Sequence, residues 1–506
     1  MRGFVALTPA AVVLATMLVL PSCSDDPSSP ATDGGVVTGD ATPMDPPHEG
    51  GLPGDGSVAS ADYRAGTRLH PIFTTGGGAR LFDRLHDSQL DTDCSYAKVA
   101  DGTLRCLPTS PRSGSVYFTD PSCAQKIVAW QATCAPSTPD KYAVYTNFEV
   151  GCATPEVLEL DVASAPATTY EMNSGACVAY AGAALTYRSV TRTVPPSELV
   201  AATVSREPRG KQLFNTHYEG ADGSRQLFGV EDGAPHAGPC DAAKAGDGTL
   251  RCAPTNLAFI ESLYSEATCT TPAAYRPGYT SASCNTAPVA ILESANGVCA
   301  GTNAAKYYDV GAKVSGPIYQ GSPASCSVAA SLGAGSTFYA KGAAIPDSAL
   351  AALKRVPSAG TPLGVDVLAV DSGEELRATS FWDPARNAPC RAGKASDGKT
   401  RCVGSTGDSP TFADASCVQA LAVVYHAAAG CMAPVPTHIW TLTAGVNICA
   451  AGTVRGFTVG GKVTPAQIYS GSSCTPIAPD TVNADYYATT AEIAPTDLVE
   501  LTEVTE

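Results

Sequence analysis

Cysteine is the residue type in this chain whose number and spacing point to chemistry most directly. The 506 residues include 19 cysteines and seven histidines, and no two cysteines are separated by only two residues. Structural zinc sites usually contain such closely spaced cysteines, whereas the cysteines of exported proteins usually form disulfides. The spacing therefore favours disulfides over a metal centre, and we expect neither a metal ion nor another cofactor.

Eighteen of the cysteines fall into three sets of six with similar spacing. The gaps are 12, 17, 11, 18 and 25 residues in the first set, and the three sets begin 146 and 150 residues apart. Self-similarity at a fixed period indicates a threefold internal repeat. The cysteines expected to form disulfides are Cys94, Cys106, Cys123, Cys134, Cys152, Cys177, Cys240, Cys252, Cys269, Cys284, Cys299, Cys326, Cys390, Cys402, Cys417, Cys431, Cys449 and Cys474.

The first two cysteines of each set flank a short loop. Cys94 and Cys106 are symmetric about residue 100, so a hairpin loop over residues 98–102 would place them directly opposite one another. Facing residues of a hairpin lie within the Cα separation that a disulfide requires. A similar Lys-x-x-Asp-Gly loop occurs at residues 244–248 and 394–398. We predict pairing of the first cysteine with the second, of the third with the fourth, and of the fifth with the sixth.

An arginine precedes the second cysteine of every set, in the motif Asp-Gly-x-x-Arg-Cys. These arginines are Arg105, Arg251 and Arg401. They could form three equivalent contacts to an anion or glycan, or each could bond a carboxylate or carbonyl within the scaffold. We favour the structural role, because features shared by diverged copies are those that a scaffold requires. Specific binding is then expected in loops that differ, such as residues 137–141 and 278–282.

Motifs of known enzymes do not account for the remaining polar residues. Residues 393–400 match the P-loop string, but they coincide with the predicted hairpin loop and lack the strand-to-helix context of that motif. The neighbours His86 and Asp87 could be an acid/base pair, although the third copy has Trp382-Asp383 there. Asp91 and Asp93 would suit glycosidase chemistry only if folding brought two carboxyls within about 5 to 9.5 Å. We predict no catalytic residue and no enzyme activity.

The coarse pattern along the chain is that of short β-strands. Residues 115–119, 142–146, 438–442 and 486–490 are rich in β-branched and aromatic side chains and are bounded by turn-forming residues. Glycine-rich turns at 76–78, 220–223 and 371–373 predict a hairpin at the start of each copy. The best helix candidate is the single run 348–355. We predict an all-β fold of three tandem antiparallel repeats, arranged like a β-propeller, or alternatively three separate small sandwiches or barrels.

The N-terminal residues have the pattern of an export signal. Arg2 supplies one positive charge, residues 4–20 are largely apolar, and Leu20-Pro21-Ser22-Cys23 follows. This tetrad resembles the bacterial lipobox, although Pro21 replaces the usual small residue. The resemblance implies a lipoprotein signal peptide at 1–22 and a lipidated Cys23, the one cysteine outside the three sets. Several acyl chains on one residue would give a stable membrane anchor.

An acidic segment separates the expected anchor from the repeats. Residues 24–62 contain seven aspartates and one glutamate, no Lys or Arg, and many Pro, Gly and Ser residues. Such a composition cannot bury enough apolar surface to fold. We therefore expect a disordered tether at 23–62, followed by β-repeats at 63–208, 209–357 and 358–506.

The overall charge excludes one class of partner. The formal net charge is −16 at pH 7, and such a chain is not suited to neutralising phosphates, so we expect no nucleic acid as a partner.

A lipobox, an acidic tether and repeated Asp-Gly-x-x-Arg-Cys units together resemble cysteine-rich surface lipoproteins of the myxobacterial type. The resemblance covers the signal and most of residues 64–506 and implies an outer-membrane, extracytoplasmic location in the bacterial envelope. It supplies no activity. The first hypothesis is a non-enzymatic binding or adhesion protein that presents variable loops to a glycan or surface protein. A structural envelope component and an extracytoplasmic hydrolase are the alternatives.

Overall fold

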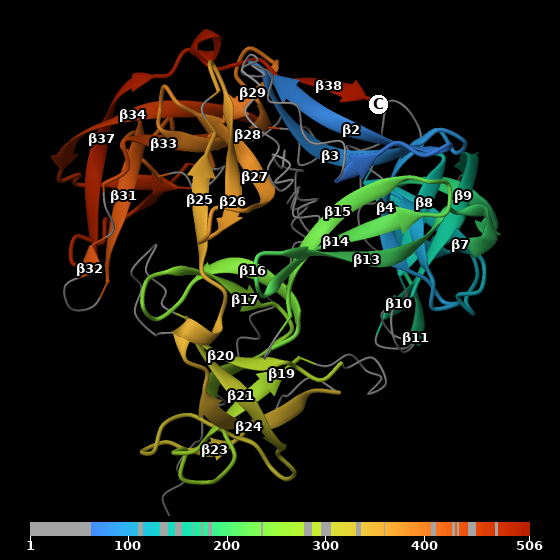
Figure 1. The fold of residues 1–506 in the computed structure, drawn as a ribbon, viewed down its shortest axis with the longest axis horizontal. Coiled ribbons are helices and arrows are strands. Elements are labelled where there is room, and N and C mark those ends of the chain that lie inside the picture. Colours follow the sequence, from blue (N-terminus) through green and yellow to red (C-terminus); the bar gives the residue numbers. More distant parts are fainter. Residues whose placement is uncertain are drawn as a thin grey trace, which may run out of the picture. The chain divides into compact units, whose positions relative to one another are not determined.

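The structure is a computed structural model in which β-strands form nearly all regular elements (Figure 1). It describes residues 62–109, 115–131, 140–146, 154–164, 166–173, 176–180, 185–233, 236–277, 286–294, 305–329, 335–358, 360–405, 411–427, 431–432, 435–443, 452–470 and 474–506. Helical residues in these ranges are confined to the 3-10 turns η2 (Pro196–Glu198), η4 (Asp347–Ala349) and η5 (Pro495–Asp497). The described residues contain no helix long and apolar enough to span a bilayer. The predicted all-β fold is confirmed.

Each repeat begins with four consecutive antiparallel strands, here called its first half; those of repeats 1 and 2 belong to one 11-stranded sheet, and those of repeat 3 to a five-stranded sheet. The predicted opening hairpins are confirmed, since a tight turn joins the first two strands in every copy. The strands are β2 (Leu69–Gly76), β3 (Ala79–Asp87), β4 (Thr92–Lys98) and β5 (Leu104–Pro108); β14 (Leu213–Gly220), β15 (Arg225–Asp232), β16 (Gly238–Lys244) and β17 (Leu250–Pro254); and β26 (Gly364–Val370), β27 (Glu375–Asp383), β28 (Ala388–Lys394) and β29 (Thr400–Val403).

The last strand of each repeat pairs with the first strand of the next one. These closing strands are β13 (Ala201–Arg209), β25 (Leu353–Pro357) and β38 (Thr502–Thr505). β13 pairs with β14 and β25 with β26, while β38 returns to pair with β2, the first long strand of repeat 1 (Figure 1). The first half of the same repeat is contacted too: β13 pairs with β5, while Ala352 and Glu500, just before β25 and β38, bridge to β17 and β29. The pairings therefore run from repeat to repeat and return to the beginning.

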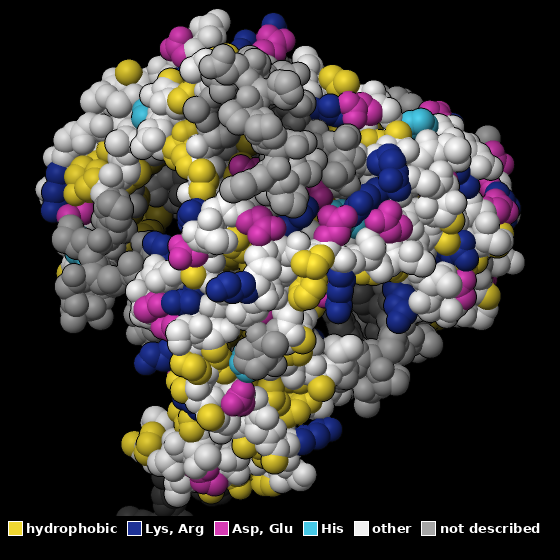
Figure 2. All heavy atoms as spheres, viewed as in Figure 1, with side chains coloured by type: hydrophobic (Ala, Val, Ile, Leu, Met, Phe, Trp, Pro, Cys, Tyr) yellow, Lys and Arg dark blue, Asp and Glu magenta, His cyan; other side chains and the backbone are white. Residues whose placement is uncertain are grey.

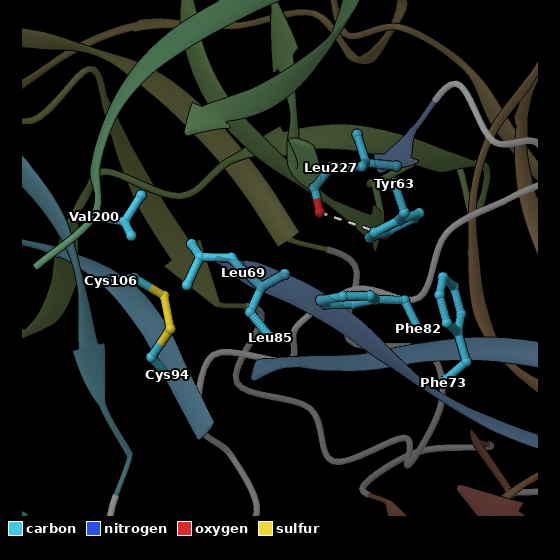
Figure 3. Packing of buried hydrophobic residues seen from close by; sticks show 9 residues of the cluster. All are labelled: Tyr63, Leu69, Phe73, Phe82, Leu85, Cys94, Cys106, Val200 and Leu227. Carbon is cyan, nitrogen blue, oxygen red and sulfur yellow. Dashed lines mark hydrogen bonds between the residues drawn. A yellow bond between two sulfur atoms is a disulfide. The ribbon is translucent and has the colours of Figure 1, made fainter. Parts of the chain in front are cut away.

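The hydrophobic core follows the same order. The cluster around the first disulfide of repeat 1 contains Tyr63, Leu69 and Phe73, and it includes Leu227 of repeat 2 (Figure 3). The corresponding cluster of repeat 2 takes in Leu368 of repeat 3, and that of repeat 3 takes in Ala79 of repeat 1. Because strands and core side chains are shared, the first halves are not three separate domains.

The second half of each repeat forms a sheet of its own. In repeat 2 the pairings of β18, β19, β24, β21 and β20 close into a small barrel. The strands are β6 (Ser115–Phe118), β7 (Lys126–Gln131), β8 (Tyr142–Thr146), β9 (Pro155–Ser164), β10 (Tyr170–Asn173), β11 (Ala176–Ala179) and β12 (Leu185–Val194); β18 (Leu257–Tyr264), β19 (Pro272–Arg276), β20 (Ala290–Ser294), β21 (Ala305–Lys313), β22 (Tyr319–Gln320), β23 (Ser327–Val328) and β24 (Thr337–Ala344); and β30 (Thr411–Phe412), β31 (Ala420–Ala427), β32 (Cys431–Met432), β33 (His438–Thr443), β34 (Thr453–Val463), β35 (Ile468–Ser470), β36 (Thr475–Ile477) and β37 (Ala484–Glu492).

The first disulfide of every repeat is confirmed, but its position in the hairpin differs from the prediction. Cys94–Cys106, Cys240–Cys252 and Cys390–Cys402 are bonded, with Cα atoms 5.4, 5.2 and 5.3 Å apart. Cys94 lies opposite Pro108, and Cys106 lies opposite Tyr96, so the bond is diagonal. The turn includes residues 99–103 because Gly102 adopts a φ of 80°, a left-handed conformation that favours glycine.

The prediction for the third and sixth cysteines is wrong. The third cysteine pairs with the sixth in each repeat, as Cys123–Cys177, Cys269–Cys326 and Cys417–Cys474. The physical reason is that the strand before the third cysteine pairs with the strand before the sixth. The fourth and fifth cysteines lie outside the described residues, except for Cys431, whose side chain is not described.

The helix candidate at 348–355 does not form a helix. Residues 347–349 form the 3-10 turn η4, and residues 353–357 form the closing strand β25. Pairing of β25 with β26 satisfies the backbone groups that a helix would otherwise have bonded internally.

Candidate functional site

The recurring arginine of the Asp-Gly-x-x-Arg-Cys motif bonds the scaffold in all three repeats. Arg251 donates from Nη1 to the carbonyl of Leu350 at 2.8 Å and from Nη2 to Asp247 at 2.6 Å. Arg105 and Arg401 donate in the same way to the carbonyls of Leu199 and Leu498. Each arginine therefore fixes the chain just before the closing strand, which favours the structural role over ligand contact.

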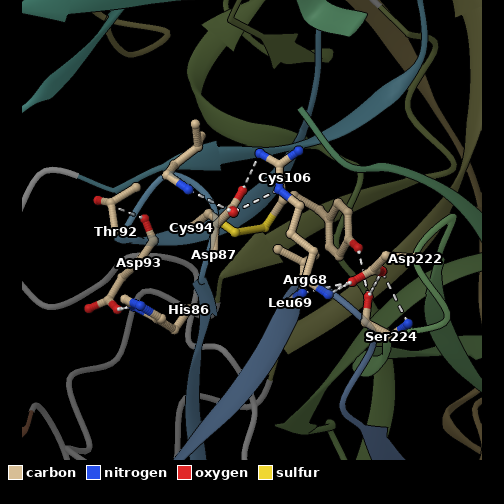
Figure 4. Close-up of a disulfide and its surroundings, with 12 residues drawn as sticks. Arg68, Leu69, His86, Asp87, Thr92, Asp93, Cys94, Cys106, Asp222 and Ser224 are labelled. Atoms are coloured by element: carbon tan, nitrogen blue, oxygen red, sulfur yellow. Dashed lines mark hydrogen bonds and ion pairs between the residues drawn. A yellow bond between two sulfur atoms is a disulfide. The ribbon is translucent and has the colours of Figure 1, made fainter. Parts of the chain in front are cut away.

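A recurring buried aspartate serves the same junction. Asp87, at the end of β3, is fully buried and accepts hydrogen bonds from Nε and Nη2 of Arg68, each at 2.7 Å (Figure 4). Arg68 in turn donates to the carbonyl of Glu198 in η2. The equivalent aspartates are Asp232 and Asp383, which contact Gln212 and Arg386.

The structure does not support the acid/base pair of His86 and Asp87. Successive residues of a strand face opposite sides of the sheet, and His86 Nδ1 lies 3.0 Å from Asp93 instead (Figure 4). Asp93 also accepts a bond from Arg84 Nε at 2.5 Å. A hydrogen bond from Lys141 lowers the pKa of the Asp91 carboxyl. A glycosidase needs one carboxyl that retains its proton, and Asp91 is not suited to that role.

The P-loop string is a hairpin loop, as expected from the sequence. β28 precedes it and β29 follows it, so no helix directs backbone N–H groups towards a phosphate. Lys399 Nζ is paired with Glu500 at 2.7 Å.

Residues 137–139 and 278–282 of the two predicted variable loops lie outside the described residues. Lys141, which is described, pairs with Asp91 at 3.0 Å.

A buried charged cluster that the sequence did not reveal lies where the folded chain begins. His217, on β14, is fully buried, and its Nε2 lies 2.8 Å from Oδ1 of the equally buried Asp62. Glu207 offers a further ligand atom close to both. Asp62 is the one residue of the predicted tether that the structure describes, and it directly precedes strand β1 (Tyr63–Arg64), which pairs with β15. The cluster therefore attaches the start of repeat 1 to repeat 2.

The electrostatics of this cluster favour an internal ion-pair network over a metal site. Arg209 Nη2 lies 3.8 Å from Asp62 and 3.4 Å from Glu207. Burial raises the pKa of Glu207, but the hydrogen bond from Arg225 and the charges of Arg225, His217 and Arg209 together lower it. Two carboxylates are thus balanced by two guanidinium groups, which would repel an incoming cation.

The charged network is specific to repeat 2. Leu69, Leu213 and Leu363 are equivalent buried residues at the start of the three repeats. Four positions later, repeat 1 has Phe73 and repeat 3 has Val367, both buried apolar residues, where repeat 2 has His217. The scaffold itself therefore does not require a histidine at this position.

The described part of the chain includes open grooves in repeats 1 and 2. One, of about 450 Å³, lies in repeat 1, and its cationic side chains are neutralised by neighbours: Lys126 by Glu156 at 2.6 Å and Arg192 by Glu159 at 2.6 Å. The other, of about 460 Å³, lies in repeat 2 and is lined by Glu261, Ser262, Leu263, Gln320, Gly321, Ser325 and Ser327. Figure 2 shows positive and negative side chains interspersed on the face in view, without a broad patch of one sign.

Comparison with known proteins gives a family but no activity. The model of a family of unknown function, DUF7481, matches residues 56–147 and 129–355, which together make up more than half of the chain. No curated protein and no solved structure is significantly similar to this chain.

Proposed function

The chain belongs to the DUF7481 family of unknown function, and we propose that it is an envelope-anchored protein that binds a ligand without catalysis. Its ligand contacts lie on surfaces displayed by a disulfide-linked β scaffold. The observation that carries this proposal is a difference between two groups of polar residues: recurring ones that bond the scaffold, and polar residues of repeat 2 that line a groove. Those that recur in all three repeats bond the scaffold, as Arg105, Arg251 and Arg401 do. By contrast, the side chains of Glu261, Ser262, Gln320 and Ser327, which line the groove of repeat 2, form no hydrogen bond or ion pair within the described part of the chain.

The location supports a role outside the cytoplasm. The disulfides indicate an oxidising, extracytoplasmic compartment. Our proposal adds a lipid on Cys23 and residence at the outer membrane, supported by the lipobox-like sequence Leu20-Pro21-Ser22-Cys23. It also extends the resemblance to cysteine-rich surface lipoproteins.

Binding is tested with the full-length protein in detergent micelles, applied to intact bacterial cells and to a glycan array, with and without reductant. We expect binding to either target that is lost after reduction. If nothing binds in either state, a structural envelope component becomes the better explanation. Turnover of a glycan by the purified protein would instead favour the hydrolase alternative.

The anchor is tested separately by labelling with a fatty acid. We expect the parent protein to incorporate the label and Cys23→Ala not to incorporate it. A Cys23→Ala protein that remains in the membrane fraction, with no label in the parent, would contradict lipidation.

A further inference from the structure

The groove of repeat 2 is built on a covalently fixed framework. Strand β18 contributes Glu261, Ser262 and Leu263, and the short strands β22 and β23 provide the opposite wall. Leu263 pairs directly with Gln320 across the strands. Cys326 lies between the lining residues Ser325 and Ser327 and is bonded to Cys269. The two walls are therefore linked by hydrogen bonds and by a disulfide, so a ligand would meet a preformed surface.

One glycine makes the turn in this wall possible. Gly321 has a φ of 117°, and a Cβ added there would lie 2.3 Å from the carbonyl oxygen of Ser325. No other residue fits without moving the backbone. The glycine thus keeps the turn close against Ser325, next to the disulfide.

The polar side chains of the groove are available to a ligand. Within the described part of the chain, the side chains of Glu261, Ser262, Gln320 and Ser327 form no hydrogen bond or ion pair, and all four residues are exposed. Together they offer a carboxylate, an amide and two hydroxyls, which can both donate and accept hydrogen bonds. Lys, Arg and His are absent from the lining.

Repeat 1 does not reproduce this set of side chains, and repeat 3 has only hydroxyl residues, Ser470 and Thr475, at the positions of Gln320 and Ser327. Tyr170 and Tyr319 are equivalent residues, and the residue after each is Glu171 in repeat 1 and Gln320 in repeat 2. The residue after the sixth cysteine is Val178 in repeat 1 but Ser327 in repeat 2. The scaffold therefore does not require the amide of Gln320 at this position.

From these observations we infer that the groove of repeat 2 binds a neutral carbohydrate; this inference rests on the proposed binding function. Its volume of about 460 Å³ falls within the usual range of small-ligand sites. Sugar hydroxyls match the mixed donors and acceptors of the groove. The carboxylate of Glu261, without a cationic neighbour in the lining, disfavours sulfated and sialylated sugars.

The test compares the full-length protein with the double variant Glu261→Gln/Gln320→Ala on a glycan array that contains neutral, sulfated and sialylated sugars. We expect the parent to prefer neutral sugars and the variant to bind them roughly tenfold more weakly, because two hydrogen-bonding groups are weakened or lost. Both substitutions are at exposed positions, and an unchanged thermal midpoint will confirm folding. Glu171→Gln in repeat 1 is the matched control and should bind like the parent.

The outcomes separate this inference from the proposed function. Undiminished binding by the double variant, or a preference for sulfated or sialylated sugars, would overturn the inference while the binding function stands. Failure of the parent to bind any glycan also overturns it. Binding of the parent to intact cells in the same preparation then decides whether the binding function survives, through a ligand such as a surface protein.

Discussion

Asp62 and His217, 155 residues apart in the chain, form a hydrogen bond of 2.8 Å in which neither side chain is exposed to solvent. This contact holds the first described residue of the chain against repeat 2. The next residue, Tyr63, stacks on Phe82 of repeat 1 with ring centroids 4.3 Å apart. Two adjacent residues therefore connect two repeats, one through a hydrogen bond and one through aromatic packing.

We predict that breaking this pair destabilises the folded body. Asp62→Asn or His217→Phe alone should lower the free energy of unfolding by about 3 kcal/mol, because each leaves a buried polar partner uncompensated. The double variant should cost less than the sum of the two, as expected for residues in contact. Urea denaturation measures these values. Asp309→Asn, at an exposed position on β21, is the control and should change stability by less than about 0.5 kcal/mol. Strictly additive effects would contradict the coupling.

The loop around the third cysteine should loosen in acid. The Asp120 carboxylate accepts hydrogen bonds from the hydroxyl of Ser122 and from backbone N–H groups, such as that of Gln125 at 2.6 Å. These bonds lower the pKa of Asp120 from 3.8 to about 2. Since the folded-state pKa is the lower one, the unfolded chain binds more protons between these values. The stabilisation is therefore complete above about pH 4 and is lost as the pH falls towards 2.

Amide hydrogen exchange measures this effect. After correction for intrinsic rates, the protection of the Ala124 and Gln125 N–H groups should fall between pH 4 and pH 2. Asp120→Asn should show weaker protection that no longer changes over this range. Glu266 provides an independent check in repeat 2, because bonds from Thr271 and Thr270 lower its pKa to about 2. Protection that does not depend on pH in the parent would disprove this account.

The connectivity of the third cysteine is directly testable in repeat 1. Trypsin and Glu-C cleavage should place Cys123 on a peptide ending at Lys126, and Cys177 on residues 172–188. We expect mass spectrometry without reduction to find these two peptides linked, and not a link from Cys123 to Cys134. Cys123→Ser should lower stability by about 4 kcal/mol in the chain-entropy model for a loop of this length. Cys177→Ser should cost the same, and the double variant should cost little more.

The sequence contained a signal for this pairing. An aromatic residue precedes both the third and the sixth cysteine in every repeat, and the structure places these residues opposite one another as Phe118–Tyr170, Tyr264–Tyr319 and Phe412–Tyr469. Cross-strand aromatic pairs are typical of adjacent strands. Recognition of this pairing would have predicted the disulfide. The first disulfide was predictable because its two strands are joined by a short hairpin.

The sharing of strands between repeats and the Asp62–His217 contact were not predictable in the same way. Composition assigns Asp62 to the tether, since it follows a segment rich in Asp, Pro and Gly. Its burial depends on a histidine 155 residues away, and no local pattern records such a distance. The pairing of β38 with β2 likewise joins opposite ends of the chain. The periodicity of the sequence predicts the elements within each repeat, whereas these contacts depend on how one repeat packs against another.

The recurring arginines provide a test that separates scaffold from ligand contact. Arg251→Ala removes two charge-assisted hydrogen bonds, to Leu350 and Asp247. It should therefore lower the free energy of unfolding by about 2 to 3 kcal/mol. Ligand affinity of the folded variant, measured well below its unfolding midpoint, should be unchanged. A loss of affinity at parental stability would instead assign Arg251 to the binding surface.

The C-terminal strand should determine the stability of the first strand of repeat 1. β38 covers residues 72–75 of β2, and Glu503 on β38 pairs with Arg84 of β3 at 2.8 Å. Deletion of residues 502–506 should expose the N–H groups of β2 that face β38 and raise their hydrogen-exchange rates. Glu503→Gln should have a smaller effect, because it removes only the ion pair with Arg84, and an exposed ion pair contributes only about 0.2 to 1 kcal/mol. The amides of β26 are the internal control, because β26 pairs with β25 and not with β38. Deletion of β38 should raise their exchange rates only if it promotes global unfolding. Equal acceleration in β2 and β26 under native conditions would contradict a local role for β38, because the deletion would then have lowered global stability.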